Sequence, residues 1–361
     1  MNVLHIINEL NDSIGGAEQL LLGSLPFYQT QLGKIDVLVL RDIDSFWQRK
    51  LQQEISGRLI TLSKISLYNP ILVLKLIPYF KNYDIVHVHL FPSLYWVGLA
   101  KWLSQSNVLL IYTEHSTNNK RRNNPLLRIM DKYIYSKYDK IVCVSPLAEK
   151  KLKDHLRSNN DKTLTIKNGI DLFRIKNAKQ SDTLEGGEIK IMMVARFHYP
   201  KDHLTLIKSL LYLSEKIHLY FAGEGDLLEK CKLFTKSLSL QDRVHFLGFR
   251  NDIPSLLKTA SIIVISSAYE GLSLASIEAM ACGKPFIASD VEGLREIVEG
   301  AGVLFKFGDE KDLASKIQVL LDDPIYYNQI VEKCIERTMD YDIRKMVNNY
   351  IDVYHRLLDE Q

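Results

Sequence analysis

The sequence has few of the features that mark secreted, disulfide-bonded or membrane-spanning proteins. Its 361 residues include four cysteines and no CxxC pair, a usage that favours reduced thiols in a cytosolic protein over a disulfide framework or a zinc site. No apolar stretch reaches the roughly 18 residues of a membrane-spanning helix. Met1-Asn2 leads straight into an apolar run without the basic segment of a signal peptide. These absences predict a cytoplasmic protein.

The length and composition predict a globular protein of two domains. A chain of 361 residues exceeds the size of one ordinary hydrophobic core. Its 46% hydrophobic and 25% charged residues are typical of globular folds.

The small net charge of +3 conceals a basic segment at residues 120–140. This segment has seven basic and two acidic residues, so it carries a charge of +5, and apolar residues recur in it at helical spacing. Such a helix can lie on an anionic membrane surface, or it can be a solvated helix packed on its own sheet. Nucleic acid is a weaker interpretation, because no known binding module surrounds the basic residues. The first two interpretations stay open.

Short apolar runs rich in β-branched residues alternate with helical patterns along the whole chain. In the first half, we expect strands at residues 3–7, 35–40, 59–62, 84–90, 108–113, 140–145 and 164–166. After a polar stretch at 177–188, we expect strands at 189–195, 217–222, 244–247, 260–265 and 285–289, with helices at 202–213, 227–238, 253–258 and 274–281. Such alternation forms parallel sheets with helices on both faces. The prediction is an α/β protein with two Rossmann-like, doubly wound domains facing across a cleft.

Charged residues in the second half follow the ends of predicted strands. Arg196 closes one strand, and Lys201 stands just before the next helix. Glu270 precedes the helix at 274–281, and Glu278 lies inside it. Ligands of doubly wound sheets bind at the carboxyl ends of the strands, where helix N-termini offer N–H groups to anions, so two cations there suit a diphosphate. On spacing alone, the glutamates could equally be a charge at a helix end and a solvated side chain.

Glycine turns and a histidine mark further strand ends. Gly15-Gly16 and Gly223 stand where the chain leaves a predicted strand, and glycine there lets a ligand approach the backbone closely. His115 follows the strand at 108–113, in a position where it could exchange protons near neutral pH. A histidine that merely packs in a loop is an equally good interpretation at this point.

His87 and His89 alternate along one predicted strand and so share a face of it. Two histidines on one face could hold a metal ion, but no third ligand is evident in the sequence. Histidines packed beneath a helix are commoner, so we expect no metal site.

Taken in order, these residues resemble the motifs of glycosyltransferase family 4, the retaining GT-B glycosyltransferases related to sucrose synthase and bacterial mannosyltransferases. The strongest match is EGLSLASIE, from Glu270 to Glu278, followed by AMACGKP. Supporting matches are GGAE at 15–18, NGID at 168–171, VAR at 194–196 with Lys201, GEG at 223–225 and GLREIV at 293–298. Two departures are the FHYP link at 197–200 and Ser273, which stands where proline is frequent. Neither departure removes a charged group, and the resemblance covers essentially the whole chain.

The resemblance implies a domain order. Residues 1–170 would form a Rossmann-like acceptor-binding domain, and residues 171–342 a Rossmann-like domain that binds the nucleotide-sugar. Residues 343–361 would form a helix that crosses back to the first domain.

The resemblance also implies a role for each motif residue. Arg196 and Lys201 would hold the donor diphosphate, Glu278 the ribose and Glu270 the donor sugar. His115 would lie near the reacting sugar, where it orients the acceptor or stabilises charge. The remaining donor contacts would come from backbone around Gly15, Gly16, Gly223, Gly271, Leu272, Ser273 and Leu274. Neither a metal ion nor a cofactor is implied, and a UDP-sugar is favoured over a GDP-sugar as donor.

The resulting hypothesis is a retaining glycosyltransferase that moves a sugar to a glycan or lipid-linked acceptor, in surface polysaccharide or glycolipid synthesis at the inner face of the cell membrane. Two alternatives share the donor site. A nucleotide-sugar 2-epimerase of the same fold would convert its donor without an acceptor. A non-catalytic nucleotide-sugar or membrane-binding protein would bind donor without transfer, and the presence of both glutamates and both cations speaks against it.

Overall fold

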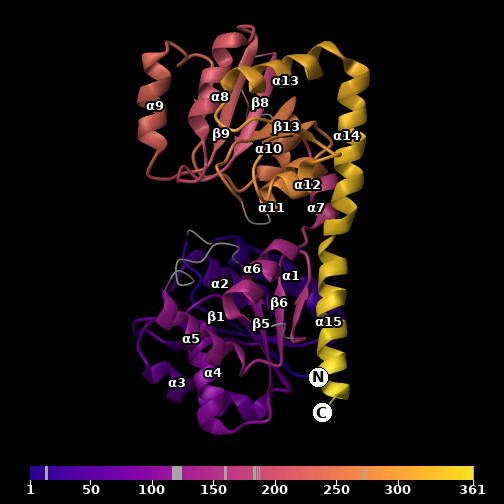
Figure 1. The fold of residues 1–361 in the computed structure, drawn as a ribbon. Helices are drawn as coiled ribbons and strands as arrows, with labels where there is room; N and C mark the ends of the chain where they lie inside the picture. The colour runs from indigo at the N-terminus through magenta and orange to yellow at the C-terminus, as the bar shows by residue number, and fades with distance from the viewer. Residues whose placement is uncertain are drawn as a thin grey trace. The chain divides into compact units, whose positions relative to one another are not determined.

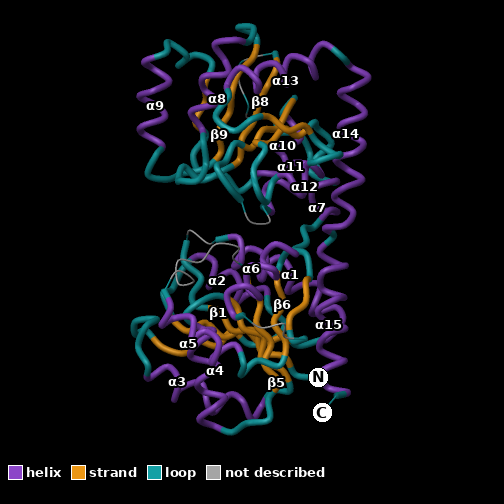
Figure 2. Tube along the Cα trace, viewed as in Figure 1, coloured by secondary structure: helices purple, strands orange, loops and turns teal. Residues whose placement is uncertain are grey.

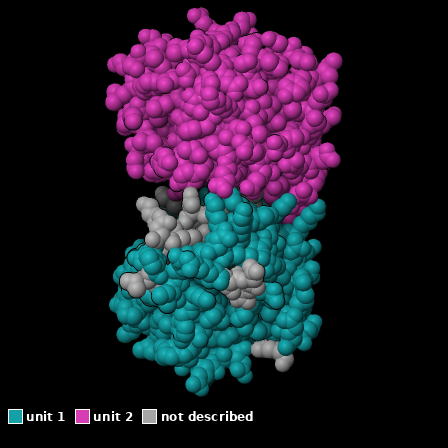
Figure 3. Space-filling view, viewed as in Figure 1, with its two compact units in different colours: residues 1–169, 343–361 teal, residues 170–342 magenta. Residues whose placement is uncertain are grey.

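The structure is a computed structural model that describes residues 1–360 except 13, 14, 116–123, 158–160, 182, 183, 185, 187, 271 and 272. The chain divides into two compact units, residues 1–169 with 343–361 and residues 170–342 (Figures 1 and 3). In each unit, helices surround a central sheet (Figure 2). The two doubly wound α/β domains expected from the sequence are therefore confirmed.

The described part of the first unit contains a seven-stranded parallel sheet in the order β3-β2-β1-β4-β5-β6-β7. Its strands are β1 (Val3–Ile7), β2 (Ile35–Arg41), β3 (Leu59–Ser63), β4 (Ile85–His89), β5 (Leu109–Glu114), β6 (Lys140–Cys143) and β7 (Thr163–Thr165). Every residue of β1, β4 and β5 is buried, which is why these strands have apolar residues on both faces. The strand order reverses between β1 and β4, the point at which doubly wound sheets bind ligands.

The helices of the first unit cover this sheet. They are α1 (Gly16–Leu32), α2 (Phe46–Glu54), α3 (Ile71–Leu76), α4 (Ser93–Ser104), α5 (Pro125–Tyr135), α6 (Pro146–Leu156) and α15 (Ile343–Asp359). The C-terminal helix α15 packs beside α1, where the Gln31 side-chain amide donates a hydrogen bond of 2.7 Å to Asn348 Oδ1. Tyr354 of α15 reaches the sheet itself, with its hydroxyl 2.6 Å from His87 Nδ1.

The second unit has a parallel sheet of six described strands in the order β10-β9-β8-β11-β12-β13. These are β8 (Ile189–Val194), β9 (Ile217–Ala222), β10 (Val244–Phe246), β11 (Ile262–Ile265), β12 (Phe286–Ser289) and β13 (Val303–Phe305). The helices are α7 (Leu172–Lys176), α8 (His203–Ser209), α9 (Leu228–Ser237), α10 (Ile253–Thr259), α11 (Leu274–Ala281), α12 (Arg295–Val298), α13 (Glu310–Asp322) and α14 (Pro324–Thr338).

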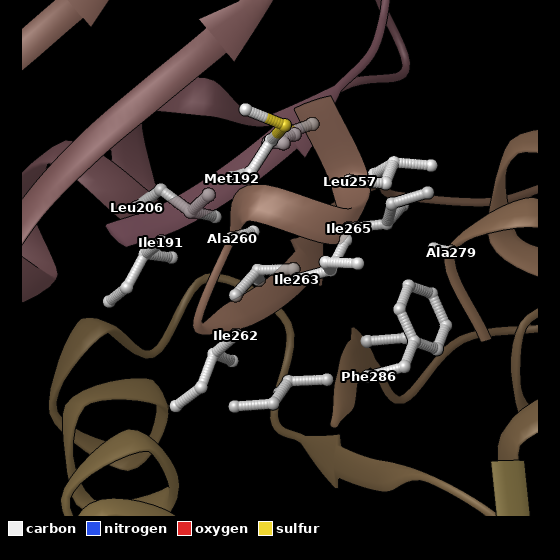
Figure 4. Close-up of a cluster of buried hydrophobic side chains, with 14 of the residues drawn as sticks. Ile191, Met192, Leu206, Leu257, Ala260, Ile262, Ile263, Ile265, Ala279 and Phe286 are labelled. Carbon is white, nitrogen blue, oxygen red and sulfur yellow. The ribbon is translucent and has the colours of Figure 1, made fainter. Parts of the chain in front are cut away.

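The core of the second unit lies between its sheet and these helices. Ile263, Ile265 and Phe286 come from neighbouring strands and are at most 1% exposed (Figure 4). Burying one such side chain contributes about 1.5–3 kcal/mol. The core thereby fixes the ends of β11 and β12, from which the motif residues extend.

Element ends differ from the sequence-based bounds where a side chain caps a helix. The strand expected at 140–145 ends at Cys143, because Ser145 caps α6 and accepts a 3.1 Å hydrogen bond from the Ala148 amide. The helix expected at 202–213 is α8, which begins after its cap Asp202 and continues as a short 3₁₀ helix at 210–212. Of the basic segment at 120–140, the structure describes residues 124–140, which include α5, because residues 116–123 lie outside the described residues. None of the described helices could cross a membrane by length and apolarity.

Candidate active site

The loop after β8 is joined to the loop after β11 by backbone hydrogen bonds. The Asp202 amide donates to the Ser266 carbonyl at 3.0 Å, and the Ala268 amide donates to the Pro200 carbonyl at 2.9 Å. Ser267 also bonds to Ser289 at the end of β12, in both directions, at 2.8 and 2.9 Å. The loops that follow β8, β11 and β12 are therefore held together at one edge of the sheet.

Lys201 and Glu270 form an ion pair across these joined loops. Their side chains are 17% and 13% exposed, so water screens the attraction less than at an open surface. The Glu270 amide donates to the Glu292 carbonyl at 3.2 Å, which ties the third loop to the same place. The structure thus brings one predicted cation and one predicted sugar-binding carboxylate into direct contact.

Arg196 lies on the same loop as Lys201, but its side chain is exposed. Among the described residues, no ion pair to Arg196 is found. An exposed guanidinium at the carboxyl edge of the sheet can take up an anionic ligand without first breaking a contact with a carboxylate.

Gly223 and Gly225 follow β9, and the chain packs closely at both. Gly223 has a φ of +148°, and a Cβ atom there would lie 2.1 Å from the Ala195 carbonyl oxygen. A Cβ atom at Gly225 would lie 2.5 Å from the Phe197 carbonyl oxygen. The sequence interpretation assigned Gly223 to close approach of a ligand. The structure adds a second reason for glycine, namely close approach of the loop after β8.

The helix α11 begins at Leu274 and is capped by Ser273, which accepts a hydrogen bond from the Ser276 amide. Capping explains why serine is suited to this position, where proline is frequent in the family, because its hydroxyl accepts a hydrogen bond from a free amide at the helix end. Leu274 is half-buried against the core. Gly271 and Leu272, the other predicted donor contacts of this loop, lie outside the described residues.

Glu278 is a half-buried residue of α11. Burial raises the pKa of its carboxyl group, and the nearby Arg174 of α7 partly opposes this shift. A ligand that donates hydrogen bonds stabilises the charged form of such a carboxylate, and two adjacent ribose hydroxyls could donate them. The surroundings of Glu278 are therefore suited to the role that the family resemblance implied.

In the first unit, Gly15 caps α1 and Gly16 is its first residue. A Cβ atom at Gly16 would meet no atom of the described residues within 4 Å, so their packing does not require glycine there. This open space beside the first turn of a helix of 17 residues is compatible with the predicted backbone contact to an anionic ligand.

His115 stands at the carboxyl end of β5, as predicted, and it belongs to a cluster that the sequence did not reveal. His5 of β1 lies beside His87 of β4 in the strand register, and His89 follows on the same face. The ligand nitrogens of His5, His87 and His89 lie within 4.8 Å of one another. No third ligand was evident in the sequence for His87 and His89, and the structure supplies a candidate, because β1 with His5 pairs with β4. The sequence signal was an HxH pattern on β4 beside a lone histidine on β1.

Two family profiles match the chain. The one described as “Glycosyl transferases group 1” matches residues 174–337, and the one described as “Glycosyltransferase Family 4” matches residues 14–174. Among curated proteins, the chain is 28% identical over 251 residues to the O-antigen biosynthesis glycosyltransferase WbnH of Escherichia coli, covering 69% of each chain. It is 25% identical over 294 residues to the Escherichia coli UDP-Gal:alpha-D-GlcNAc-diphosphoundecaprenol alpha-1,3-galactosyltransferase, covering 76% of each chain.

The fold is also that of solved structures. The crystal structure of HepE from Anabaena in complex with UDP superposes with a TM-score of 0.85 over 99% of this chain and 100% of that one, at 19% identity. The family expected from the motifs is thereby confirmed by profiles that together span residues 14–337. The chain belongs to glycosyltransferase family 4, and it is a nucleotide-sugar-dependent glycosyltransferase with the GT-B fold.

Proposed function

We propose that the protein transfers a sugar from a UDP-sugar to a lipid-linked or glycan acceptor, with retention of configuration, in surface polysaccharide synthesis. Two relatives support the acceptor class, since one is named for O-antigen biosynthesis and the other for a diphosphoundecaprenol substrate. UDP as the nucleotide part of the donor is supported by the name of the second relative and by the UDP complex of HepE. These names do not favour a 2-epimerase.

The observation that carries this proposal is the Lys201–Glu270 pair at the joined strand ends. In the proposal, Lys201 and Arg196 bind the donor diphosphate, and Glu270 accepts hydrogen bonds from hydroxyls of the donor sugar. Glu278 binds the ribose, for which its desolvated carboxyl group is suited. The backbone from Gly271 to Leu274 and at Gly223 completes the donor site.

The reaction in this proposal needs no general base on the protein. The acceptor hydroxyl oxygen bonds to the anomeric carbon from the face that UDP leaves. The bond from that carbon to the phosphate oxygen breaks, its electron pair stays on UDP, and the acceptor proton passes to a phosphate oxygen. Arg196 and Lys201 stabilise the charge that develops on the diphosphate, a contribution worth a factor of about 10²–10³ in rate per donor group in comparable sites. A metal ion is not required for this step.

From the first unit, the backbone at Gly15 and Gly16 contacts the donor phosphates in this proposal. His115 lies near the reacting sugar, and it orients the acceptor or stabilises charge.

The donor assignment is tested by turnover with UDP-, GDP- and ADP-sugars. We expect transfer from a UDP-sugar to an undecaprenyl-diphosphate-linked sugar, and at least a hundredfold loss of rate in Lys201→Ala and Glu270→Ala. Lys232 and Glu229 form an exposed ion pair in the same unit, so Lys232→Ala and Glu229→Ala are matched controls that should keep the wild-type rate. Unchanged transfer by the two site variants would refute the assignment, and acceptor-independent conversion of the donor would favour the epimerase.

We further propose that α5 contacts an anionic membrane surface. Ile129, Met130 and Tyr133 are 70%, 52% and 43% exposed, and Arg128 and Lys132 lie on the same helix. Large exposed apolar side chains beside basic ones suit the boundary between lipid headgroups and acyl chains.

Liposome co-sedimentation tests this contact. We expect binding to vesicles with anionic lipid that weakens in Ile129→Glu and at high salt. Leu233 of the second unit is also 70% exposed, so Leu233→Glu is a control with the same change of charge. Absence of wild-type binding at low salt would refute the contact.

A further inference from the structure

Three histidine rings form a hydrogen-bonded chain that ends at the predicted active-site residue. His5 Nδ1 lies 3.1 Å from His89 Nε2, and His89 Nδ1 lies 3.2 Å from His115 Nε2. Both distances are those of hydrogen bonds. His5 and His89 are buried on β1 and β4, whereas His115 is half-buried at the end of β5. The chain therefore runs from the interior of the first unit to the carboxyl edge of its sheet.

Desolvation keeps these rings neutral. Burial lowers the pKa of His5 to about 3 and that of His115 to about 4, and it lowers the pKa of His89 as well. Among the described residues that line the small cavity at this cluster, none is a carboxylate, lysine or arginine; besides the histidines, the titratable groups facing it are Tyr28 and Tyr350. A neutral imidazole has one N–H donor and one bare nitrogen acceptor.

Because each ring has one donor, all hydrogen bonds in the chain must point the same way. Either every Nδ1 carries the proton and His115 receives a bond at Nε2, or every Nε2 carries it and His115 donates inward. The buried end decides between these, since His5 Nε2 has no hydrogen-bond partner among the described residues. A buried unpaired N–H is rarer than a buried unpaired acceptor, so a bare Nε2 on His5 is the better state. This places the protons on Nδ1 throughout the chain.

We propose that His89, supported by His5, is a positioning residue that holds His115 as the Nδ1–H tautomer, so that His115 donates a hydrogen bond to an oxygen of the reacting sugars. The tautomer follows from the cluster alone. Its effect on transfer rests on the proposed place of His115 in the active site. In this state, the Nε2 lone pair of His115 is occupied by His89, and His115 acts as a donor and not as a base.

A metal ion is the competing occupant of this cluster. His5, His87 and His89 have the residue type and the spacing for one, but the nitrogens of His87 already lie 2.6 Å from Tyr354 Oη and 2.7 Å from Thr113 Oγ1. A metal ion could bind the unpartnered Nε2 of His5. To be bound by all three residues, it would also have to replace one hydrogen bond of His87 and one of His89.

The test is ¹⁵N NMR of histidine-labelled full-length protein without donor, which reads directly which ring nitrogen carries the proton. We expect Nδ1–H for His115 in the wild type. His89→Gln lacks a donor at the Nδ1 position and should give mixed His115 tautomers, with a roughly tenfold lower kcat and an unchanged KM for the donor. His89→Asn keeps an amide donor there and should recover most of the rate. His87→Asn perturbs the same buried cluster outside the chain, and it should keep the wild-type tautomer and kcat.

Three outcomes would overturn the proposal. An Nε2–H tautomer of His115 in the wild type would reverse the chain. Stoichiometric zinc in the purified protein, or zinc titration that shifts the His5, His87 and His89 signals, would assign a metal site instead. The expected tautomers with an unchanged kcat in His89→Gln would show that His115 does not act in transfer, which separates failure of the active-site placement from failure of the chain. The wild-type spectrum decides the tautomer even if a variant fails to fold.

Discussion

Breaking the Lys201–Glu270 pair should lower the stability of either single variant and change UDP binding in opposite directions for the two partners. Lys201→Met leaves the Glu270 carboxylate without its partner, and Glu270→Gln leaves the Lys201 ammonium without one. The double variant removes both charges together. If the pair stabilises the ligand-free protein, the double variant should lose less unfolding free energy than the two single variants lose in sum.

The exposure of the pair sets the magnitude. Exposed pairs are worth about 0–1 kcal/mol, whereas removing one partner of a fully buried pair costs about 3–5 kcal/mol. Side chains that are 17% and 13% exposed lie between these limits, so each single variant should lose about 2 kcal/mol of unfolding free energy. For a unit the size of residues 170–342, this loss corresponds to a Tm decrease of roughly 4–8 °C. We expect the cycle to give a coupling energy of about 1–2 kcal/mol.

Differential scanning fluorimetry with and without UDP measures both effects. A ligand that binds only the folded protein raises the unfolding free energy by RT ln(1 + L/Kd), where L is the concentration of free ligand, and it therefore raises Tm. Glu270→Gln should keep or increase the UDP-induced shift, because its Lys201 is no longer shared with a carboxylate. Lys201→Met should lose most of that shift. A coupling energy below about 0.3 kcal/mol, within the range of independent sites, or a full UDP shift in Lys201→Met, would refute this reasoning.

Three further changes test other parts of the structure. Burial raises the pKa of Glu278 above its unfolded value, so the stability contributed by its protonated form is present at low pH and lost as the pH rises through the folded pKa. In the same fluorimetric assay, Glu278→Gln should therefore raise Tm at pH 7 but not at acidic pH. The same variant should abolish the UDP-induced Tm shift. Gly223→Ala should lower the unfolding free energy by about 3 kcal/mol in urea titrations, because its Cβ atom would lie 2.1 Å from the Ala195 carbonyl oxygen at a φ of +148°. Gly16→Ala should leave the unfolding free energy unchanged, because its Cβ atom would meet no described residue within 4 Å. Asp131 is buried and accepts hydrogen bonds from a tyrosine and a histidine, so Asp131→Asn should cost about 2 kcal/mol in the same titration, and no loss would contradict the network that anchors α5.

The sheets could be predicted from the sequence because their strands are buried on both faces. Such strands are short apolar runs, and β1 and β11 have bounds close to those expected. Element ends were less predictable, since they depend on which side chain captures the free amides. Ser145 and Asp202 set the starts of α6 and α8 by capping them. The sequence alone did not distinguish them from other polar residues nearby.

Site residues that follow strand ends could be predicted from the sequence. Contacts that depend on which strands pair could not. Lys201 and Glu270 are far apart in the chain, yet both follow strands of one parallel sheet, whose carboxyl ends share an edge. The contact of His5 with His87 and His89 depends on β1 lying beside β4. The strand order is a property of the sheet topology, and the residue pattern within one strand does not predict it.

The candidate site residues differ from the core in that the fold alone does not favour them. A half-buried ion pair, a desolvated Glu278 and a His5 nitrogen without a partner among the described residues each cost folding free energy. Apolar residues at these positions would pack with less penalty, and a ligand or a reaction that uses their charge or their protons would explain their presence. A diphosphate would take up Lys201, and a ribose diol would donate to Glu278. The same groups that lower the stability of the ligand-free protein would then supply the specificity of its donor site.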